Sequence, residues 1–167
     1  MGRLWCLGFM VLVLMAVSSC SSDKFNLPEN ANALLTNNSS KTWKLAKRHN
    51  DGYRMNMGNC FLSYRVTYNA NGITTDNNAQ HKDCGDSMEA NWSFYTNDDG
   101  SYIKLKGDKV KILLNQEKDY KFFKIKELSD TLLIVSFKHK QFGNKERTIE
   151  DHLVPEAMVV EDRRYHN

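Results

Sequence analysis

Apolar and polar residues alternate with a period of two through most of this chain. Between Asn59 and Tyr68, the apolar residues at every second position are Leu62, Tyr64, Val66 and Tyr68. The same spacing recurs in Trp92 and Phe94; Ile103 and Leu105; Val110, Ile112 and Leu114; Phe123 and Ile125; and Leu133, Val135 and Phe137. Successive side chains of a strand point to opposite faces, so the pattern predicts a series of strands that each bury one face.

Turn-forming residues separate the predicted strands. These turns are Asn50-Asp51-Gly52, Asn71-Gly72, Asp99-Gly100, Gly107-Asp108 and Ser129-Asp130. About eight short strands joined by close turns favour a mainly β, antiparallel up-and-down meander, and closure into a barrel removes exposed edges. A short helix is expected over Ala31–Leu35, ended by the polar cluster at 37–40. The sequence lacks the alternation of strands and helices that would indicate a parallel sheet.

The N-terminus has a different character. Arg3 precedes an apolar run, Leu4–Val17, that ends at Val17-Ser18-Ser19-Cys20. The run is shorter than the roughly 20 residues that a spanning helix needs. It resembles the export signal and lipobox of bacterial lipoproteins. The resemblance implies cleavage after residue 19, a lipid on Cys20 and an anchor in the outer membrane. It does not distinguish the periplasmic face of that membrane from the cell-surface face.

These features divide the chain into four parts. Residues 1–19 are expected to be a signal peptide, 20–30 a lipidated cysteine and flexible tether, 31–153 a barrel domain and 154–167 a C-terminal tail. The apolar residues of the tail indicate packing on the barrel, with docking on a partner as the alternative.

Two cysteines remain in the expected exported domain, Cys60 and Cys84. Disulfides form in oxidising compartments, so we expect these two residues to be joined. The alternative is a metal site of Cys60, His81 and Cys84, for which no fourth ligand stands at a recognisable offset.

Several motifs together resemble the lipocalin-like lipoproteins of Bacteroidetes. They are Lys41-Thr42-Trp43-Lys44-Leu45 after a short helix, the two cysteines flanking a strand and an Asn-Gly turn, Trp92-Ser93-Phe94, and Ile125-x-x-Leu128-x-x-x-Leu132-x-Ile134. The resemblance implies a small lipocalin-like barrel, a fold that can hold one apolar ligand. We expect Trp43, Tyr64, Trp92 and Phe94 in the barrel core. Bulky inward residues leave open whether the barrel is hollow or filled.

No motif predicts catalysis. Nucleophile-elbow, zinc-protease, phosphate-loop and dinucleotide signatures are absent from the sequence. The five histidines show no metal-ligand spacing, and neighbours in Glu150-Asp151-His152 would point to opposite faces of a strand. We therefore expect a protein that is not an enzyme and that has no cofactor and no metal.

Charge argues against a nucleic-acid partner. The chain has 23 basic and 20 acidic residues, and lysines that alternate with aliphatic residues are typical of the solvent face of a strand. The functional alternative for these lysines is a weak attraction to anionic envelope glycans or lipid headgroups. Asp86-Ser87-Met88 and Asp130-Thr131-Leu132 resemble the O-glycosylation pattern of exported Bacteroidetes proteins, with Ser87 and Thr131 as acceptors.

These observations favour a lipid-anchored envelope protein that binds a small apolar ligand or a protein partner through its barrel. The alternative is a structural accessory subunit of an outer-membrane or secretion assembly, with a filled barrel. Neither the ligand, the partner nor the oligomeric state follows from the sequence.

Overall fold

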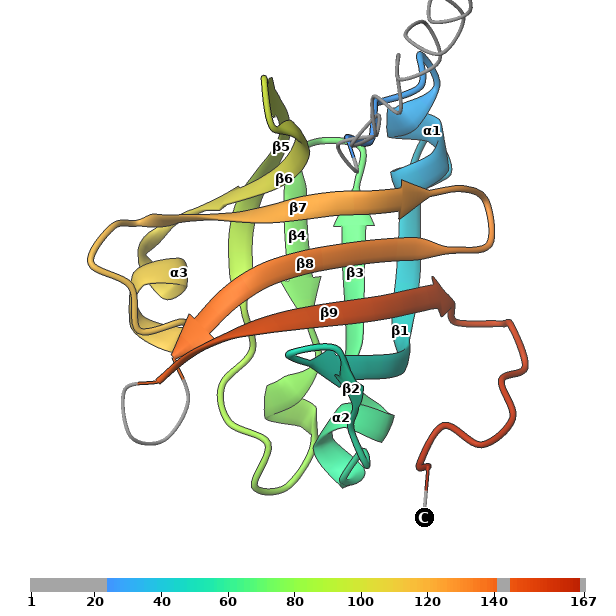
Figure 1. Ribbon diagram of the computed structural model, residues 1–167, viewed down its shortest axis with the longest axis vertical. Helices are drawn as coiled ribbons and strands as arrows, with labels where there is room; N and C mark the ends of the chain where they lie inside the picture. The colour runs from blue at the N-terminus through green and yellow to red at the C-terminus, as the bar shows by residue number, and fades with distance from the viewer. Residues whose placement is uncertain (1–23, 141–144, 166–167) are drawn as a thin grey trace, which may run out of the picture.

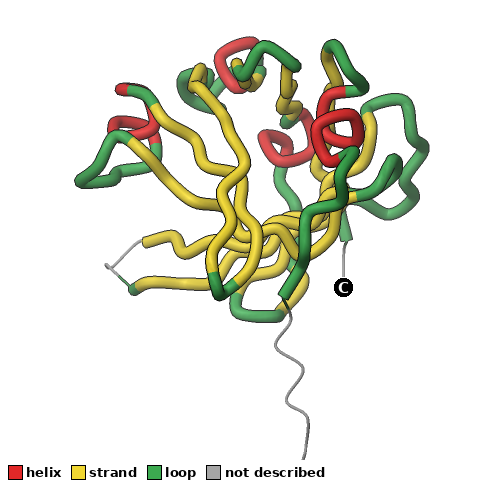
Figure 2. The backbone as a smooth tube through the Cα atoms, turned by 90° about the horizontal axis from the view of Figure 1, so that it is seen from above, coloured by secondary structure: helices red, strands yellow, loops and turns green. Residues whose placement is uncertain are grey.

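A computed structural model describes residues 24–140 and 145–165. In this part of the chain nine antiparallel strands form one sheet, in the order β2-β1-β3-β4-β5-β6-β7-β8-β9, and β1 also pairs with β9. The strands curl around a common interior (Figures 1 and 2). They are β1 (Ser40–Asn50), β2 (Tyr53–Arg54), β3 (Arg65–Asn69), β4 (Ile73–Asp76), β5 (Glu89–Asn97), β6 (Gly100–Lys106), β7 (Tyr120–Leu128), β8 (Leu133–Lys140) and β9 (Glu146–Pro155).

The two-residue strand β2 pairs only with the end of β1, so the other eight strands make the closed barrel. The prediction of a mainly β, antiparallel up-and-down barrel is confirmed. The largest fully buried apolar side chains come from strands on several sides of the barrel. They include Trp43, Leu45, Ile103, Ile125, Leu133 and Ile149.

The helix α1 (Ala31–Thr36) packs at one end of the barrel, against β1, β3 and β7. Its carbonyl groups anchor the start of β1, because the Trp43 indole Nε1 donates a hydrogen bond to the Leu35 carbonyl at 3.0 Å. The Lys41 amine donates to the Leu34 carbonyl at 2.8 Å. The short helix expected before the first strand is therefore present, and it covers this end of the core.

The helix α2 (Asn59–Ser63) and a 3-10 turn, Asn78–Gln80, lie at the opposite end from α1 (Figure 1). A disulfide between Cys60 and Cys84 joins this region, with a Cα–Cα distance of 5.3 Å. The predicted disulfide is confirmed. The metal site of Cys60, His81 and Cys84 is excluded as an alternative, because both sulfur atoms are used in the bond.

Two segments predicted as strands are helical. Leu62 lies in α2, and residues 110–114 lie in or directly after α3 (Asp108–Leu113). In α3 and directly after it, the side chains that meet the core are Val110, Leu113 and Leu114, which follow helical spacing, whereas Ile112 is 72% exposed. The period-two set 110, 112 and 114, which predicts a strand, is therefore not the set that is buried. In α2 the disulfide holds a single turn that presents Phe61 and Leu62 to the core.

The C-terminal segment packs on its own barrel. β9 continues to Pro155, two residues beyond the expected domain boundary. After it, the Arg163 guanidinium donates hydrogen bonds to the carbonyls of Leu45 and Leu62, and the Met57 amide donates to the Arg164 carbonyl. Within the described ranges, no helix is both long enough and apolar enough to cross a membrane. The expected signal peptide and Cys20 lie outside those ranges.

Candidate functional site

A cavity of about 360 Å³ lies inside the barrel near α2 and the disulfide. Its apolar wall comes from inward-facing strand residues together with Phe61 of α2. The strand residues include Val66, Leu105, Phe123, Val135, Phe137 and Ile149. Ligand cavities in proteins typically measure about 300 to 1,000 Å³ and are mainly apolar with a few fixed polar groups. This cavity therefore has the size and lining of a site for a small molecule.

An ion pair between Arg48 and Asp151 forms part of the cavity wall. Both bonds from the guanidinium to the carboxylate are 2.5 Å long, and the guanidinium also stacks on the Phe61 ring at 4.5 Å. Burial acts to lower the pKa of Arg48, but the charge of Asp151 and its hydrogen bonds outweigh burial and raise that pKa. The pair is therefore a fixed, mutually neutralised dipole in the wall.

A β-bulge explains why Arg48 faces inward. The pairing of β1 with β9 shifts at Ala46, so Leu45 lies opposite Leu153 but Lys47 lies opposite His152. The extra residue reverses the inward and outward alternation along the rest of β1. Arg48 consequently lies opposite Asp151 on the inner face, while His49 lies opposite Glu150 on the outer face.

Tyr64 and Tyr68 bring two phenol groups to the same cavity. Burial raises the pKa of Tyr64 well above its usual value and also raises that of Tyr68. Both phenols therefore stay protonated, and each can donate a hydrogen bond to a bound molecule.

Asp76 lines the cavity beside the 3-10 turn. Its Oδ1 accepts hydrogen bonds from the amides of Asn78 and Met88, both at 3.1 Å. Burial raises the pKa of Asp76, and these hydrogen bonds act in the opposite direction.

Lys121 stands where the barrel wall opens. β7 and β8 are paired only from Lys124 with Ser136 to Leu128 with Leu133, so the strands part beyond that point. The Lys121 amine is buried and has no hydrogen-bond partner among the described residues. It lies 6.0 Å from the ring centre of Phe123 and 5.1 Å from that of Phe137, two residues of the cavity wall.

Burial and nearby charges shift the pKa values of Lys121 and of its neighbour His139. Burial lowers the pKa of Lys121, and the charge of Glu146 partly offsets this effect. His139 also lines the cavity, and burial together with the charges of Lys121 and Arg48 lowers its pKa. Lys121 also lines an outer hollow of about 520 Å³ with Lys138, Lys140 and Glu146. The buried amine therefore stands between the two spaces.

The residues predicted as barrel core do not all share one role. Trp43 is fully buried and Trp92 is 7% exposed, but neither lines the cavity, whereas Phe94 is partly buried against the core. Tyr64 lines the cavity from the end of α2, not from a strand.

The two predicted glycosylation sites differ in exposure. Thr131 is exposed in the turn between β7 and β8, whereas Ser87 is half-buried and its hydroxyl accepts a hydrogen bond from the Ala79 amide. Cys20 lies outside the described residues.

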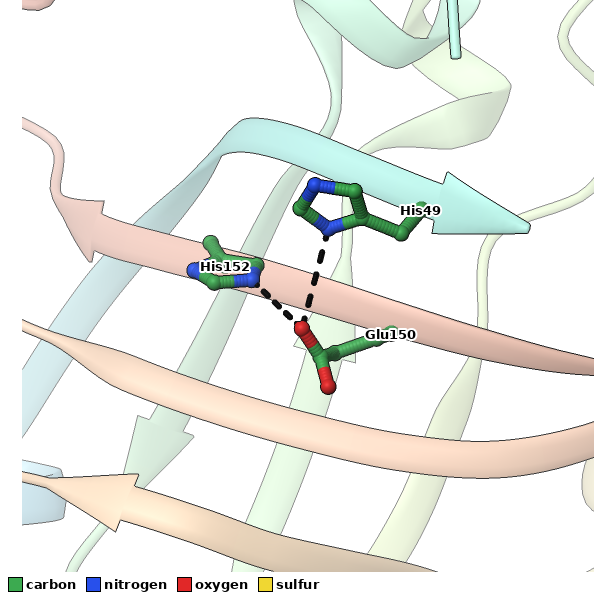
Figure 3. Close-up of side chains that lie close together, drawn as sticks. All are labelled: His49, Glu150 and His152. Carbon is green, nitrogen blue, oxygen red and sulfur yellow. Dashed lines mark hydrogen bonds and ion pairs between the residues drawn. The ribbon is translucent and has the colours of Figure 1, made fainter. Parts of the chain in front are cut away.

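A second polar cluster, which the sequence analysis missed, lies on the outer face of β1 and β9. It contains His49, Glu150 and His152 (Figure 3). In the sequence, Glu150 and His152 flank Asp151, whose side chain faces the other way. His49 joins them only through the pairing of β1 with β9, which sets it directly opposite Glu150 and for which the sequence carries no local signal.

These features define a class of protein: a small antiparallel barrel with an internal cavity of lipocalin type. The family model described as a lipocalin-like domain matches residues 40–135, more than half of the chain. The chain therefore belongs to the lipocalin-like domain family, as the sequence motifs indicated. A lipocalin-like protein from Bacteroides uniformis is a similar solved structure, with 14% identity, a TM-score of 0.47 and coverage of 72% of this chain and 97% of that one. No curated protein matches the chain.

Proposed function

We propose that this protein is a non-catalytic, lipid-anchored envelope protein that holds a small amphipathic molecule in its barrel. The observation that carries the proposal is the cavity of about 360 Å³, which has an apolar wall and several fixed polar groups. The lipobox-like segment ending at Cys20 supports the envelope anchor. Open volume inside the barrel favours ligand binding over the accessory-subunit alternative, which requires a filled interior.

The polar groups indicate what kind of ligand fits. Arg48 is already neutralised by Asp151, whereas the buried amine of Lys121 has no hydrogen-bond partner among the described residues. A buried cation without a partner carries a desolvation cost that an anion can relieve. The preferred ligand therefore has an apolar body for the cavity and one acidic group that reaches Lys121. The phenols of Tyr64 and Tyr68 can donate hydrogen bonds to polar atoms along that body.

Native mass spectrometry of the protein extracted from its own membrane tests the proposal directly. We expect a co-purifying small molecule that is released on unfolding. A stable complex with another protein and no small molecule would instead support the accessory-subunit alternative.

A cavity-filling variant locates the binding site. Val135 faces the cavity from β8, so Val135→Phe should occupy part of the open volume and abolish binding of anilinonaphthalene sulfonate, an apolar fluorescent acid. The matched control is Val159→Phe, because Val159 is 87% exposed and lies outside the barrel. Equal fluorescence enhancement in both variants would show that the probe binds elsewhere.

The acidic-group requirement has its own test. Lys121→Met keeps the length of the side chain but removes its charge, and it should weaken binding of the sulfonate probe. Its control is Lys106→Met, because Lys106 is exposed on β6. If both variants bind the probe as the unmodified protein does, Lys121 does not recognise the acidic group.

A further inference from the structure

The cluster of His49, Glu150 and His152 lies apart from the cavity, on the outer face of the strand pair that closes the barrel (Figure 3). His49 and Glu150 are cross-strand neighbours, and His152 follows Glu150 by two residues on the same face of β9. All three side chains are anchored on paired strands, which hold their positions more firmly than loops would. Their exposed fractions are 20% for His49, 36% for Glu150 and 11% for His152.

The three side chains point their donor atoms at one place. The Nε2 of His152 lies 2.7 Å from the Oε1 of Glu150, and the Nδ1 of His49 lies 3.6 Å from the same oxygen. All three donor atoms lie within 4.8 Å of one another. The two imidazole rings meet edge to face, with their centres 5.1 Å apart.

The present hydrogen bonds do not satisfy this group. Glu150 accepts a hydrogen bond from His152, but the distance to His49 is too long for one. The Nδ1 of His49 is buried and makes no hydrogen bond within the described ranges. A buried ring nitrogen that faces a carboxylate without bonding to it carries an energetic cost that a shared ligand would remove.

We propose that His49, Glu150 and His152 bind a zinc ion. Two imidazoles and one carboxylate match the nitrogen and oxygen donors that Zn²⁺ takes in proteins. Ligand bonds of about 2.0 to 2.2 Å in a tetrahedral site place donor atoms about 3.3 to 3.6 Å apart. The 3.6 Å pair already fits that spacing, and side-chain rotation suffices to open the 2.7 Å pair.

The site leaves one coordination position for water, because no fourth histidine, cysteine or acidic side chain joins the group among the described residues. The zinc ion would bridge β1 and β9. It therefore connects the two strands whose pairing closes the barrel, and binding should stabilise the folded state.

The test is a titration of Zn²⁺ into the mature protein, extracted from its membrane and produced without a histidine tag. We expect one zinc ion per chain by calorimetry and a rise in melting temperature. His49→Ala, Glu150→Gln and His152→Ala should each weaken binding at least about tenfold and remove the thermal effect. His139→Ala is the matched control, because it removes a histidine that faces the cavity, and it should bind zinc as the unmodified protein does.

Cobalt substitution reports the geometry independently of stability. Co²⁺ in a four-coordinate site gives intense visible absorption, so the unmodified protein and His139→Ala should show these bands. Each cluster variant that is folded by circular dichroism should lack them. The proposal is overturned by absent zinc binding in the unmodified protein, or by zinc binding and cobalt bands that persist in the cluster variants.

Discussion

Replacement of Trp43 tests how α1 is attached to the barrel. Trp43 is fully buried, and its indole donates a hydrogen bond to the Leu35 carbonyl at 3.0 Å. Trp43→Ala removes the buried ring and leaves a cavity, which costs about 3 to 5 kcal/mol. In a domain of this size each kcal/mol corresponds to about 2 to 4 °C, so the melting temperature should fall by about 6 to 20 °C.

Trp43→Phe separates the hydrogen bond from ring burial. Phenylalanine keeps an apolar ring but leaves the Leu35 carbonyl without its partner, at a cost of about 1 to 3 kcal/mol. Urea unfolding followed by circular dichroism measures both variants. Trp92, which is 7% exposed, remains as a fluorescent reporter in each. A loss below about 1 kcal/mol for Trp43→Ala would refute the reasoning, because a tryptophan in a packed core cannot be removed at that cost.

Three further predictions concern other parts of the molecule. Reduction of the Cys60–Cys84 bond, which closes a sequence separation of 24, should destabilise the fold by about 3 to 4 kcal/mol on the chain-entropy model, and thiol labelling of the unfolded, unreduced protein should find neither cysteine reactive. Burial raises the pKa of Asp76, so its contribution to stability is present below the unfolded pKa of about 3.9 and is lost as pH rises through the folded pKa. Asp76→Asn, which keeps an acceptor for the Asn78 and Met88 amides, should therefore be at least as stable at pH 7 and lose that advantage near pH 3; a large loss at pH 7 would contradict this. Cys20→Ala should release the protein from the membrane fraction, and intact mass should show residues 1–19 absent and a lipid on the unmodified protein; membrane retention of the variant would mean that another element anchors the chain.

The barrel itself could be predicted from local pattern. Alternation in segments such as Leu133, Val135 and Phe137 reports which face of a strand is buried, and turns such as Asn71-Gly72 report where the chain reverses. Gly72 adopts a φ of 85°, a conformation that glycine takes without strain. Because neighbouring strands in an up-and-down barrel follow one another in sequence, these local signals were enough to give the topology.

The two short helices could not be read from the same signals. Residues 110–114 contain apolar side chains at both strand and helical spacings, and short apolar segments do not distinguish the two by periodicity alone. Tertiary packing decides between them, because Val110 is buried only when α3 lies against the barrel. The region of α2 is constrained by a disulfide whose effect on local conformation is not visible in the spacing of its cysteines.

The β-bulge at Ala46 determines which polar side chains reach each of the two proposed sites. Without it, the alternation that buries Trp43 and Leu45 would continue and would carry Lys47 and His49 into the barrel. With it, Arg48 meets Asp151 on the inner face, while His49 meets Glu150 and His152 on the outer face. A single extra residue in the closing strand pair thus directs one set of polar groups to the cavity and another to the outer wall. The proposed ligand site and the proposed zinc site are therefore two sides of the same pair of strands.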